Sequence, residues 1–189
     1  MSAIFLPNNN NFAFVHIPKS AGSSVVKWLR DNNSQTEIIR GHPSLAMMKE
    51  QWDVNECFAI VRNPWSRAIS AYFYLLQGKY YWEENNIKSE QEFPSWNDWV
   101  MSLNYITDWW TPLSTNQVDW LSGFPAIVLK TETLDKDFIQ IQEKLNCFEP
   151  LPFINTTDHK DYRSYYTDDQ IKHIAKIFEK DIDTFKYTF

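Results

Sequence analysis

Short apolar runs alternate with amphipathic stretches along most of this 189-residue chain. The apolar runs predict four strands, near residues 12–17, 36–40, 56–62 and 125–130. The helical spacing predicts helices near residues 22–32, 43–50, 65–77 and 133–146, and a terminal amphipathic helix or pair over 167–187. Because strands that alternate with helices form parallel sheets through right-handed crossovers, we expect an α/β fold with a mostly parallel central sheet flanked by helices.

The stretch from about 78 to 117 does not follow this alternation. It is rich in aromatic residues, which predicts helices and loops over the ligand-binding edge of the sheet. Most of these rings are expected to pack in the core or in a lid. The composition shows no break along the chain, so we expect a single domain over residues 1–189 that contains this aromatic-rich helical insertion.

The first apolar run ends at Pro18 in a small, hydroxyl-rich loop. Proline cannot donate to a sheet ladder, so the strand ends there and the loop begins at Lys19. Residues 20–24 are small enough for backbone N–H groups to converge on an anion, and the following helix directs its positive end to the same place. Taken alone, the loop is equally compatible with an ordinary strand-to-helix connection capped by serines.

A second strand and helix carry a similar signal. The strand over 57–61 is followed by Arg62, and Pro64 stands where the first turn of a helix accepts proline. Arg62 at the strand end and Ser70 two turns into the helix can face the same pocket. Ligands of parallel α/β sheets bind outside the carboxyl ends of the strands, where Arg62 and Lys19 would both lie. The two segments together predict an anion-binding site.

At these residues the chain resembles the sulfotransferases that use 3′-phosphoadenosine 5′-phosphosulfate (PAPS), above all the carbohydrate sulfotransferases of sulfotransferase family 2. The segment from His16 to Ser24 is similar to their 5′-phosphosulfate loop. The segment from Arg62 to Tyr72 is similar to their 3′-phosphate motif, in which an arginine and a serine eight residues later hold that phosphate. Residues 128–138 and 154–166 are similar to a later strand-and-helix entry and to the C-terminal cofactor-covering loop. This ordered set spans nearly the entire chain.

The resemblance implies a P-loop-like three-layer fold and in-line transfer of a sulfuryl group from PAPS to a hydroxyl of an acceptor. PAPS is then the donor co-substrate, 3′-phosphoadenosine 5′-phosphate (PAP) is the product that leaves, and no metal is required. We expect a carbohydrate acceptor, with part of its site between residues 78 and 117, where aromatic rings suit pyranose faces. The cofactor-covering loop and its helices are expected over about 150–189. The implied donor-binding residues are Pro18, Lys19, Ser20, Ala21, Gly22, Ser23, Ser24, Arg62, Ser70, Lys160, Tyr162 and Arg163.

Two residues are predicted to be catalytic. The bridging oxygen of the donor gains negative charge as its S–O bond breaks, so a fixed cation lowers the barrier, and Lys19 is our choice. The acceptor hydroxyl must lose a proton, and His42 resembles the catalytic histidine of uronyl-type carbohydrate sulfotransferases. Glu132 is the alternative base, although we favour a scaffold role for it. His16, inside the first strand, is expected to orient or pack, and Arg67 either braces its helix, contacts phosphate or is solvated.

Composition narrows the partners further. The net charge of −6 argues against nucleic acid as a partner, so an anionic ligand must be held by a local cluster of cations. The sequence has no apolar run of about 18 residues and no basic-then-apolar N-terminus, so we expect a cytoplasmic protein without a membrane span. Cys57 and Cys147 lie far apart in the sequence and are expected to be reduced core thiols.

Two other functions stay open at this point. A P-loop nucleotide kinase would cradle phosphate at a similar place, but its lysine follows the glycine, whereas Lys19 precedes Gly22 here. In such an enzyme a metal-binding aspartate follows the corresponding strand. Here Arg62 follows the strand over 57–61. A catalytically silent nucleotide-binding module would keep the sheet and lose turnover. The retained Lys19, Arg62 and Ser70 argue against that alternative.

Overall fold

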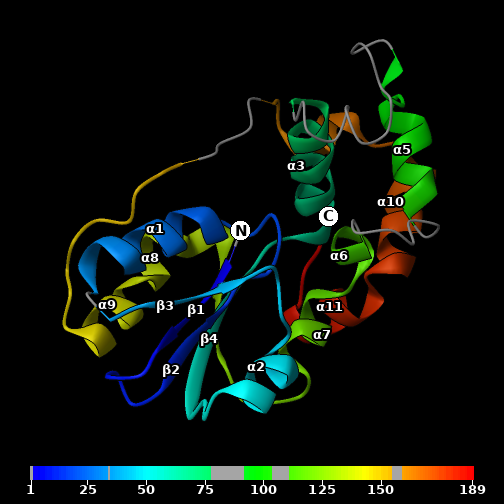
Figure 1. The fold of residues 1–189 in the computed structure, drawn as a ribbon. Coiled ribbons are helices and arrows are strands. Elements are labelled where there is room, and N and C mark those ends of the chain that lie inside the picture. Colours follow the sequence, from blue (N-terminus) through cyan, green and yellow to red (C-terminus); the bar gives the residue numbers. More distant parts are fainter. Residues whose placement is uncertain (1, 34, 78–91, 104–110, 155–158) are drawn as a thin grey trace. The chain divides into compact units, whose positions relative to one another are not determined.

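A computed structural model describes residues 2–33, 35–77, 92–103, 111–154 and 159–189 (Figure 1). The contacts within the chain divide it into two compact units. The first unit comprises Met1–Arg62 and Gln117–Thr156, and the second comprises Asn63–Asn116 and Thr157–Phe189. The expectation of a single domain over the whole chain stays a prediction.

The first unit is built on a five-stranded sheet with the order β3-β1-β2-β4-β5. The strands are Ser2–Leu6 (β1), Phe12–Val15 (β2), Glu37–Arg40 (β3), Glu56–Val61 (β4) and Ile127–Lys130 (β5). Strand β4 pairs in parallel with both β2 and β5, whereas β1 is antiparallel to both β2 and β3. The sheet is therefore mixed, and the prediction of a mostly parallel sheet is wrong.

The difference comes from β1, a strand that the analysis of the apolar runs missed. Residues 7–11 reverse the chain, and Asn10 and Asn11 take left-handed φ angles of 57° and 53°. Asparagine tolerates this conformation better than most residues do. The reversal places β1 beside β2 in a hairpin, with Ile4 opposite Phe14. Four consecutive asparagines after an apolar run were thus the signal of a turn between two strands.

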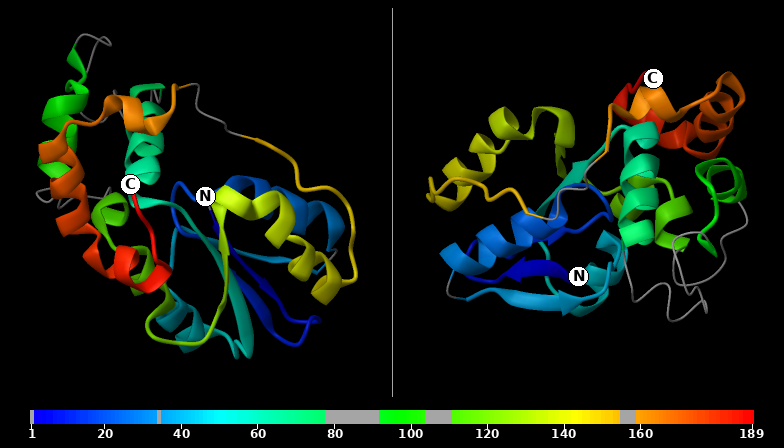
Figure 2. Two further views of the ribbon diagram at one scale, coloured as in Figure 1. Left: turned by 180° about the vertical axis from the view of Figure 1, so that it is seen from behind. Right: turned by 90° about the horizontal axis from the view of Figure 1, so that it is seen from above.

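The helices of the first unit are Gly22–Asn32 (α1), Leu45–Gln51 (α2), Gln117–Leu121 (α7), Leu134–Asp137 (α8) and Ile139–Leu145 (α9), and Thr131–Thr133 forms a 3-10 turn (η3). Helices α1, α8 and α9 pack on this sheet, and α2 and α7 pack against each other. The core lies between the sheet and helices α1, α8 and α9, whose ribbons are drawn beside the strands in Figure 1 and Figure 2. Trp28 of α1 meets Phe138 with ring centroids 5.0 Å apart, and Phe14 of β2 meets Phe58 of β4 at 4.8 Å. These apolar contacts hold the strand ends that carry the candidate site.

The second unit is helical. Its elements are Pro64–Gln77 (α3), Trp96–Ser102 (α5), Thr111–Ser114 (α6), a 3-10 turn at Tyr162–Tyr165 (η4), Asp168–Ile177 (α10) and Glu179–Phe185 (α11). Helices α3, α5 and α10 pack together (Figure 2). The Oδ1 of Asn63 accepts hydrogen bonds from the N–H groups of Trp65 and Ser66, and Pro64 needs no partner at the first helical position. Of the predicted terminal helix or pair, the structure shows the pair, α10 and α11.

Part of the aromatic stretch falls within the described residues. Tyr72 of α3 contacts the rings of Phe93, Trp96 and Trp99, with centroids 5.5, 5.5 and 5.6 Å away. Phe93 and Trp99 are buried, so these rings pack in the core of the second unit as predicted. The rest of the stretch, residues 78–91 and 104–110, lies outside the described residues. Within the described part of the chain, no helix combines the length and the apolar character that crossing a bilayer demands.

Candidate active site

The loop after β2 has the backbone of an anion-binding turn. Lys19 and Ala21 both take the left-handed conformation, with φ angles of 66° and 58°. Such residues turn successive N–H groups to one side of a loop, which forms a concave site for an anion. Helix α1 begins directly afterwards at Gly22, so its N-terminal dipole reinforces the same site.

Gly22 is required because His16 occupies the space beside it. A Cβ at position 22 would lie 2.0 Å from two atoms of the His16 ring. The ring of His16 also stacks on Phe14 at 5.7 Å, and only 2% of His16 is exposed. Of the two roles predicted for His16, orienting or packing, the structure confirms packing in the core. The same packing presses the start of α1 close to the end of β2.

Two single substitutions, one at position 22 and one at position 21, test this geometry. We expect Gly22→Ala to displace His16, to lower the free energy of unfolding by about 1–3 kcal/mol and to weaken PAP binding. Ala21→Gly is the matched control, because glycine accepts the left-handed φ and leaves the unfolding free energy equal or raised by up to about 1 kcal/mol. Urea unfolding and calorimetric titration with PAP measure both effects. Wild-type stability and binding in Gly22→Ala would contradict the account.

Lys19 and Arg62 lie side by side at the ends of β2 and β4. The Nη1 of Arg62 donates a hydrogen bond to the carbonyl oxygen of Lys19 at 3.4 Å. Burial and, to a smaller extent, the nearby charge of Arg62 together lower the pKa of Lys19 from 10.5 to about 7. A bound anion would oppose both effects by favouring the ammonium form. The structure thus brings these two predicted cations together.

His42 is held by the loop that follows β2. Its Nδ1 lies 2.7 Å from the carbonyl oxygen of His16, and the two rings meet edge to face with centroids 4.6 Å apart. A carbonyl oxygen only accepts, so Nδ1 carries the proton, and the lone pair of the neutral imidazole is on Nε2. The indole N–H of Trp120 donates to the carbonyl oxygen of His42 at 3.3 Å. This tautomer is the one that a general base acting through Nε2 requires.

Gln117, the first residue of α7, is a site residue that the sequence analysis missed. Its Oε1 accepts hydrogen bonds from the backbone N–H of Arg62 at 2.8 Å and from the hydroxyl of Ser20 at 3.2 Å. Its Nε2 donates to the carbonyl oxygen of Arg62 at 2.8 Å. The residue is 0% exposed. No motif marked this glutamine, since its partners lie 55 and 97 residues away in the chain.

The other predicted residues of the first unit surround this loop. Pro18 and Ser20 are buried, and Ser23 is half-buried. The Oγ of Ser24 accepts a hydrogen bond from the backbone N–H of Ile154 at 3.3 Å. Glu132 is exposed in η3, the turn that directly follows β5. Its assignment as base or scaffold stays a prediction.

Four predicted donor-binding residues belong to the second unit. Ser70 is buried on α3, and the backbone N–H of Lys160 donates to the hydroxyl of Tyr165 at 3.1 Å. The guanidinium of Arg163 lies 4.5 Å from the ring centroid of Tyr162. Lys160, Tyr162 and Arg163 thus cluster around η4. Their approach to Lys19 and Arg62, and that of Ser70, stays a prediction.

Arg67 braces the second unit from inside. Only 2% of it is exposed, its Nη1 donates to the carbonyl oxygen of Thr115 at 3.1 Å, and its guanidinium lies 5.7 Å from the ring centroid of Phe178. A solvated arginine, one of the alternatives considered from the sequence, is therefore wrong. The structure supports the alternative in which Arg67 braces its helix.

Both cysteines are free thiols. Cys57 is buried in β4, with its Sγ 3.6 Å from the carbonyl oxygen of Pro125, and burial raises its pKa to about 11. Cys147 is partly buried and packs against the core of the first unit. The prediction of unbridged core thiols is confirmed. Among the described residues, no group of three or more His, Cys, Asp or Glu residues is placed to hold a metal ion, and the independence from metal stays a prediction.

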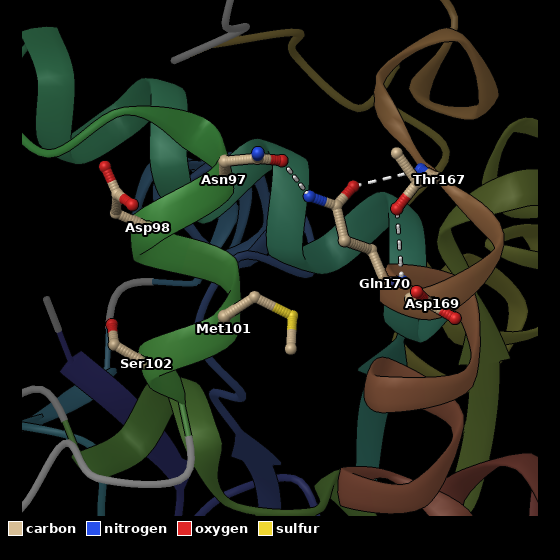
Figure 3. A pocket seen from close by; sticks show the side chains of 7 residues that line it. All are labelled: Asn97, Asp98, Met101, Ser102, Thr167, Asp169 and Gln170. Atoms are coloured by element: carbon tan, nitrogen blue, oxygen red, sulfur yellow. Dashed lines mark hydrogen bonds between the residues drawn. The ribbon is translucent and has the colours of Figure 1, made fainter.

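A pocket of about 610 Å³ lies within the second unit (Figure 3). It opens between α5 and α10, and the Met101 side chain extends from α5 toward α10. The amide of Gln170 is hydrogen-bonded to the side chain of Asn97 and to Thr167. Carboxylate, amide and hydroxyl groups line the pocket, which comprises Asn97, Asp98, Met101, Ser102, Thr167, Asp169 and Gln170.

Comparison with known proteins places this fold and site in a family. Residues 2–188 match the sulfotransferase family, so the chain belongs to that family. Its predicted membership of the PAPS-dependent sulfotransferases is thereby confirmed. A search of curated proteins finds no significant match. A solved structure of mouse sulfotransferase SULT7A1 complexed with PAP is similar, at 15% identity and a TM-score of 0.47, over 90% of this chain and 82% of that chain.

Proposed function

We propose that this protein transfers the sulfuryl group of PAPS to a hydroxyl of a saccharide by in-line displacement. The observation that carries the proposal is the meeting of two cations at one edge of the sheet. The Nη1 of Arg62 lies 3.4 Å from the carbonyl oxygen of Lys19, beside a loop with left-handed residues at the start of α1. The alternative of a nucleotide kinase is not supported by the family match, because the chain belongs to the sulfotransferases.

The donor is a polyanion, and the proposed site offers one group of contacts for each of its ends. Backbone N–H groups of residues 20–24 and the N-terminus of α1 bind the 5′-phosphosulfate. Arg62 binds the 3′-phosphate, and contacts of Ser70 and of the cluster around η4 with the donor stay predictions from the motifs. A charge-assisted hydrogen bond of this kind contributes about 1.5–3 kcal/mol. The loop and Arg62 therefore each contribute to the donor affinity in this proposal.

Lys19 and His42 carry the chemistry in this proposal. The donor supplies a sulfuryl group whose leaving oxygen becomes negative, and the ammonium of Lys19 stabilises that charge. The Nε2 of His42 takes the proton of the acceptor hydroxyl. The carbonyl oxygen of His16 accepts from Nδ1, 2.7 Å away, and so orients the ring and stabilises the imidazolium that forms.

The acceptor is proposed to contact the pocket between α5 and α10. Its lining combines the carboxylates of Asp98 and Asp169 with amide and hydroxyl groups, which suits a ligand that donates and accepts many hydrogen bonds. Met101 adds an apolar surface for the flat face of a sugar. The pocket lies partly in the stretch between residues 78 and 117 that was predicted from the sequence to contribute to the acceptor site.

Filling this pocket tests the acceptor assignment. We expect Met101→Trp to raise the acceptor KM several-fold while kcat and the PAP affinity stay unchanged, because only binding common to the ground state and the transition state is lost. Met47→Trp is the matched control, since Met47 is also exposed on a seven-residue helix, α2. Steady-state kinetics with radiolabelled PAPS measure the difference. Equal acceptor KM values in the two variants would exclude this pocket.

Incubation with radiolabelled PAPS and a panel of glycans, lipids and small metabolites tests the function itself. We expect label on a glycan. A thermal-shift comparison adds a direct check, because PAP is expected to stabilise the protein more than ATP with magnesium does. Stronger stabilisation by ATP would favour the kinase. PAP binding without transfer to any member of the panel would favour a silent module.

A further inference from the structure

We infer that Gln117 is a positioning residue that sets the spacing between the two phosphate-binding ends of the donor site. This inference rests on the proposed function, in which the loop at Ser20 holds the 5′ end and Arg62 holds the 3′ end. The side chain of Gln117 contacts both segments, which makes it a direct physical link between them. The first unit contains all the atoms involved.

The backbone of Arg62 determines which way the Gln117 amide points. The N–H of Arg62 can only donate, so the atom 2.8 Å away must be Oε1. The carbonyl oxygen of Arg62 can only accept, so the atom 2.8 Å away must be Nε2. The amide therefore pairs with Arg62 as a neighbouring strand would, one residue beyond the last residue of β4. This pairing holds the backbone from which the guanidinium projects.

The orientation of the amide in turn determines the role of the Ser20 hydroxyl. Oε1 accepts only, and it lies 3.2 Å from the Oγ of Ser20, so the hydroxyl must donate its proton to Gln117. That proton is then not available to a phosphate oxygen. Ser20 accordingly serves the 5′ end through its backbone N–H, and its side chain serves the link to Arg62. This revises the role that the motif alone suggests for this serine.

Burial makes the link rigid. Gln117 is 0% exposed and Ser20 is 1% exposed, so water does not compete for these hydrogen bonds. A bisphosphate that engages two prealigned ends binds more tightly than one that must order them on binding. The gain applies only to ligands with both phosphates. Gln117 should therefore affect the preference for PAP over adenosine 5′-phosphate (AMP), which has no 3′-phosphate.

Calorimetric titration with PAP and AMP measures that preference. We expect the wild-type protein to bind PAP more tightly, and Gln117→Met to reduce the ratio of the AMP and PAP dissociation constants by about tenfold. Methionine has a similar length and removes all three hydrogen bonds. Ile141→Val is the control, because it perturbs a fully buried residue of the core of the same unit away from the site and should leave the ratio unchanged. An unchanged ratio in Gln117→Met overturns the inference.

Ser20→Ala provides a second test that spares the Gln117–Arg62 pairing. We expect this variant to keep the AMP affinity of the wild type and to lose part of the preference for PAP. Ser23→Ala is the comparison. If the Ser23 hydroxyl binds the 5′ end directly, its removal should weaken the binding of AMP and of PAP equally. Equal weakening of both ligands by Ser20→Ala overturns the inference even if Gln117→Met does not fold. A wild-type protein without preference for PAP over AMP instead overturns the proposed donor site.

Discussion

Replacement of His42 by alanine is expected to lower kcat for sulfuryl transfer by about 10²–10⁴-fold, the usual contribution of a positioned general base. The affinity for PAP should stay unchanged, because the base acts on the acceptor and not on the donor. The Nδ1 of His42 is 2.7 Å from the carbonyl oxygen of His16, which places the reactive lone pair on Nε2. Initial rates with radiolabelled PAPS give kcat, and calorimetric titration gives the PAP affinity.

His173→Ala is the control for this result. His173 lies on α10, where burial lowers its pKa, and it has no role in the proposed reaction. Its replacement should leave kcat close to the wild-type value. If His42→Ala also retained near-normal turnover, His42 would not be the base. Glu132→Gln would then test the carboxylate in the turn after β5 as the alternative.

Donor affinity is expected to fall with rising pH because Lys19 loses its proton. In the free protein its pKa is lowered from 10.5 to about 7, first by burial and then by Arg62. A bound polyanion favours the ammonium and raises this pKa, so binding takes up a proton above pH 7. The affinity for PAP should therefore be constant below about pH 7 and decrease by up to about tenfold per pH unit above it.

Titrations at several pH values in two buffers of different ionisation enthalpy measure both the affinity and the proton uptake. Lys19→Arg is the control, since arginine keeps its charge over this range and should give a flat profile. Lys19→Met should also be flat, and its kcat should be about 10²–10³-fold lower because the leaving oxygen loses its cation. A pH dependence that persists in Lys19→Arg would assign the titration to another group.

The same pKa shift predicts how the free energy of unfolding of the protein without ligand depends on pH. The unfolded chain binds a proton at Lys19 up to its ordinary pKa of 10.5, whereas the folded chain releases that proton near pH 7. Between these values the unfolded state holds more protons, so the free energy of unfolding should rise with pH. Below about pH 7 both states are protonated, and Lys19 adds no further pH dependence. Bound PAP should remove this slope, because it keeps the folded lysine charged.

Local patterns were sufficient to predict the strand, turn and helix of the two segments that carry the candidate site. Pro18 ends an apolar run and small residues follow it, and Arg62 precedes a proline at a helix start. Each signal lies within about ten consecutive residues, so strand, turn and helix follow from neighbours in the chain. The mixed sheet was missed because the hairpin of β1 and β2 depends on a turn of asparagines that was not recognised as one. An apolar run predicts a strand but not whether that strand pairs in parallel or antiparallel with its neighbour.

The sequence alone was thus sufficient to predict the family, the loop at Lys19 and the arginine at the end of β4, because each depends on residues that are adjacent in the chain. Only the tertiary structure determines which nitrogen of His42 carries the proton, the contact of Arg62 with Lys19, and the link that Gln117 makes to Arg62. Their partners lie 26, 43 and 55 residues apart in the chain. Hydrogen bonds and desolvation act over a few ångströms in space, so no pattern of neighbouring residues records them.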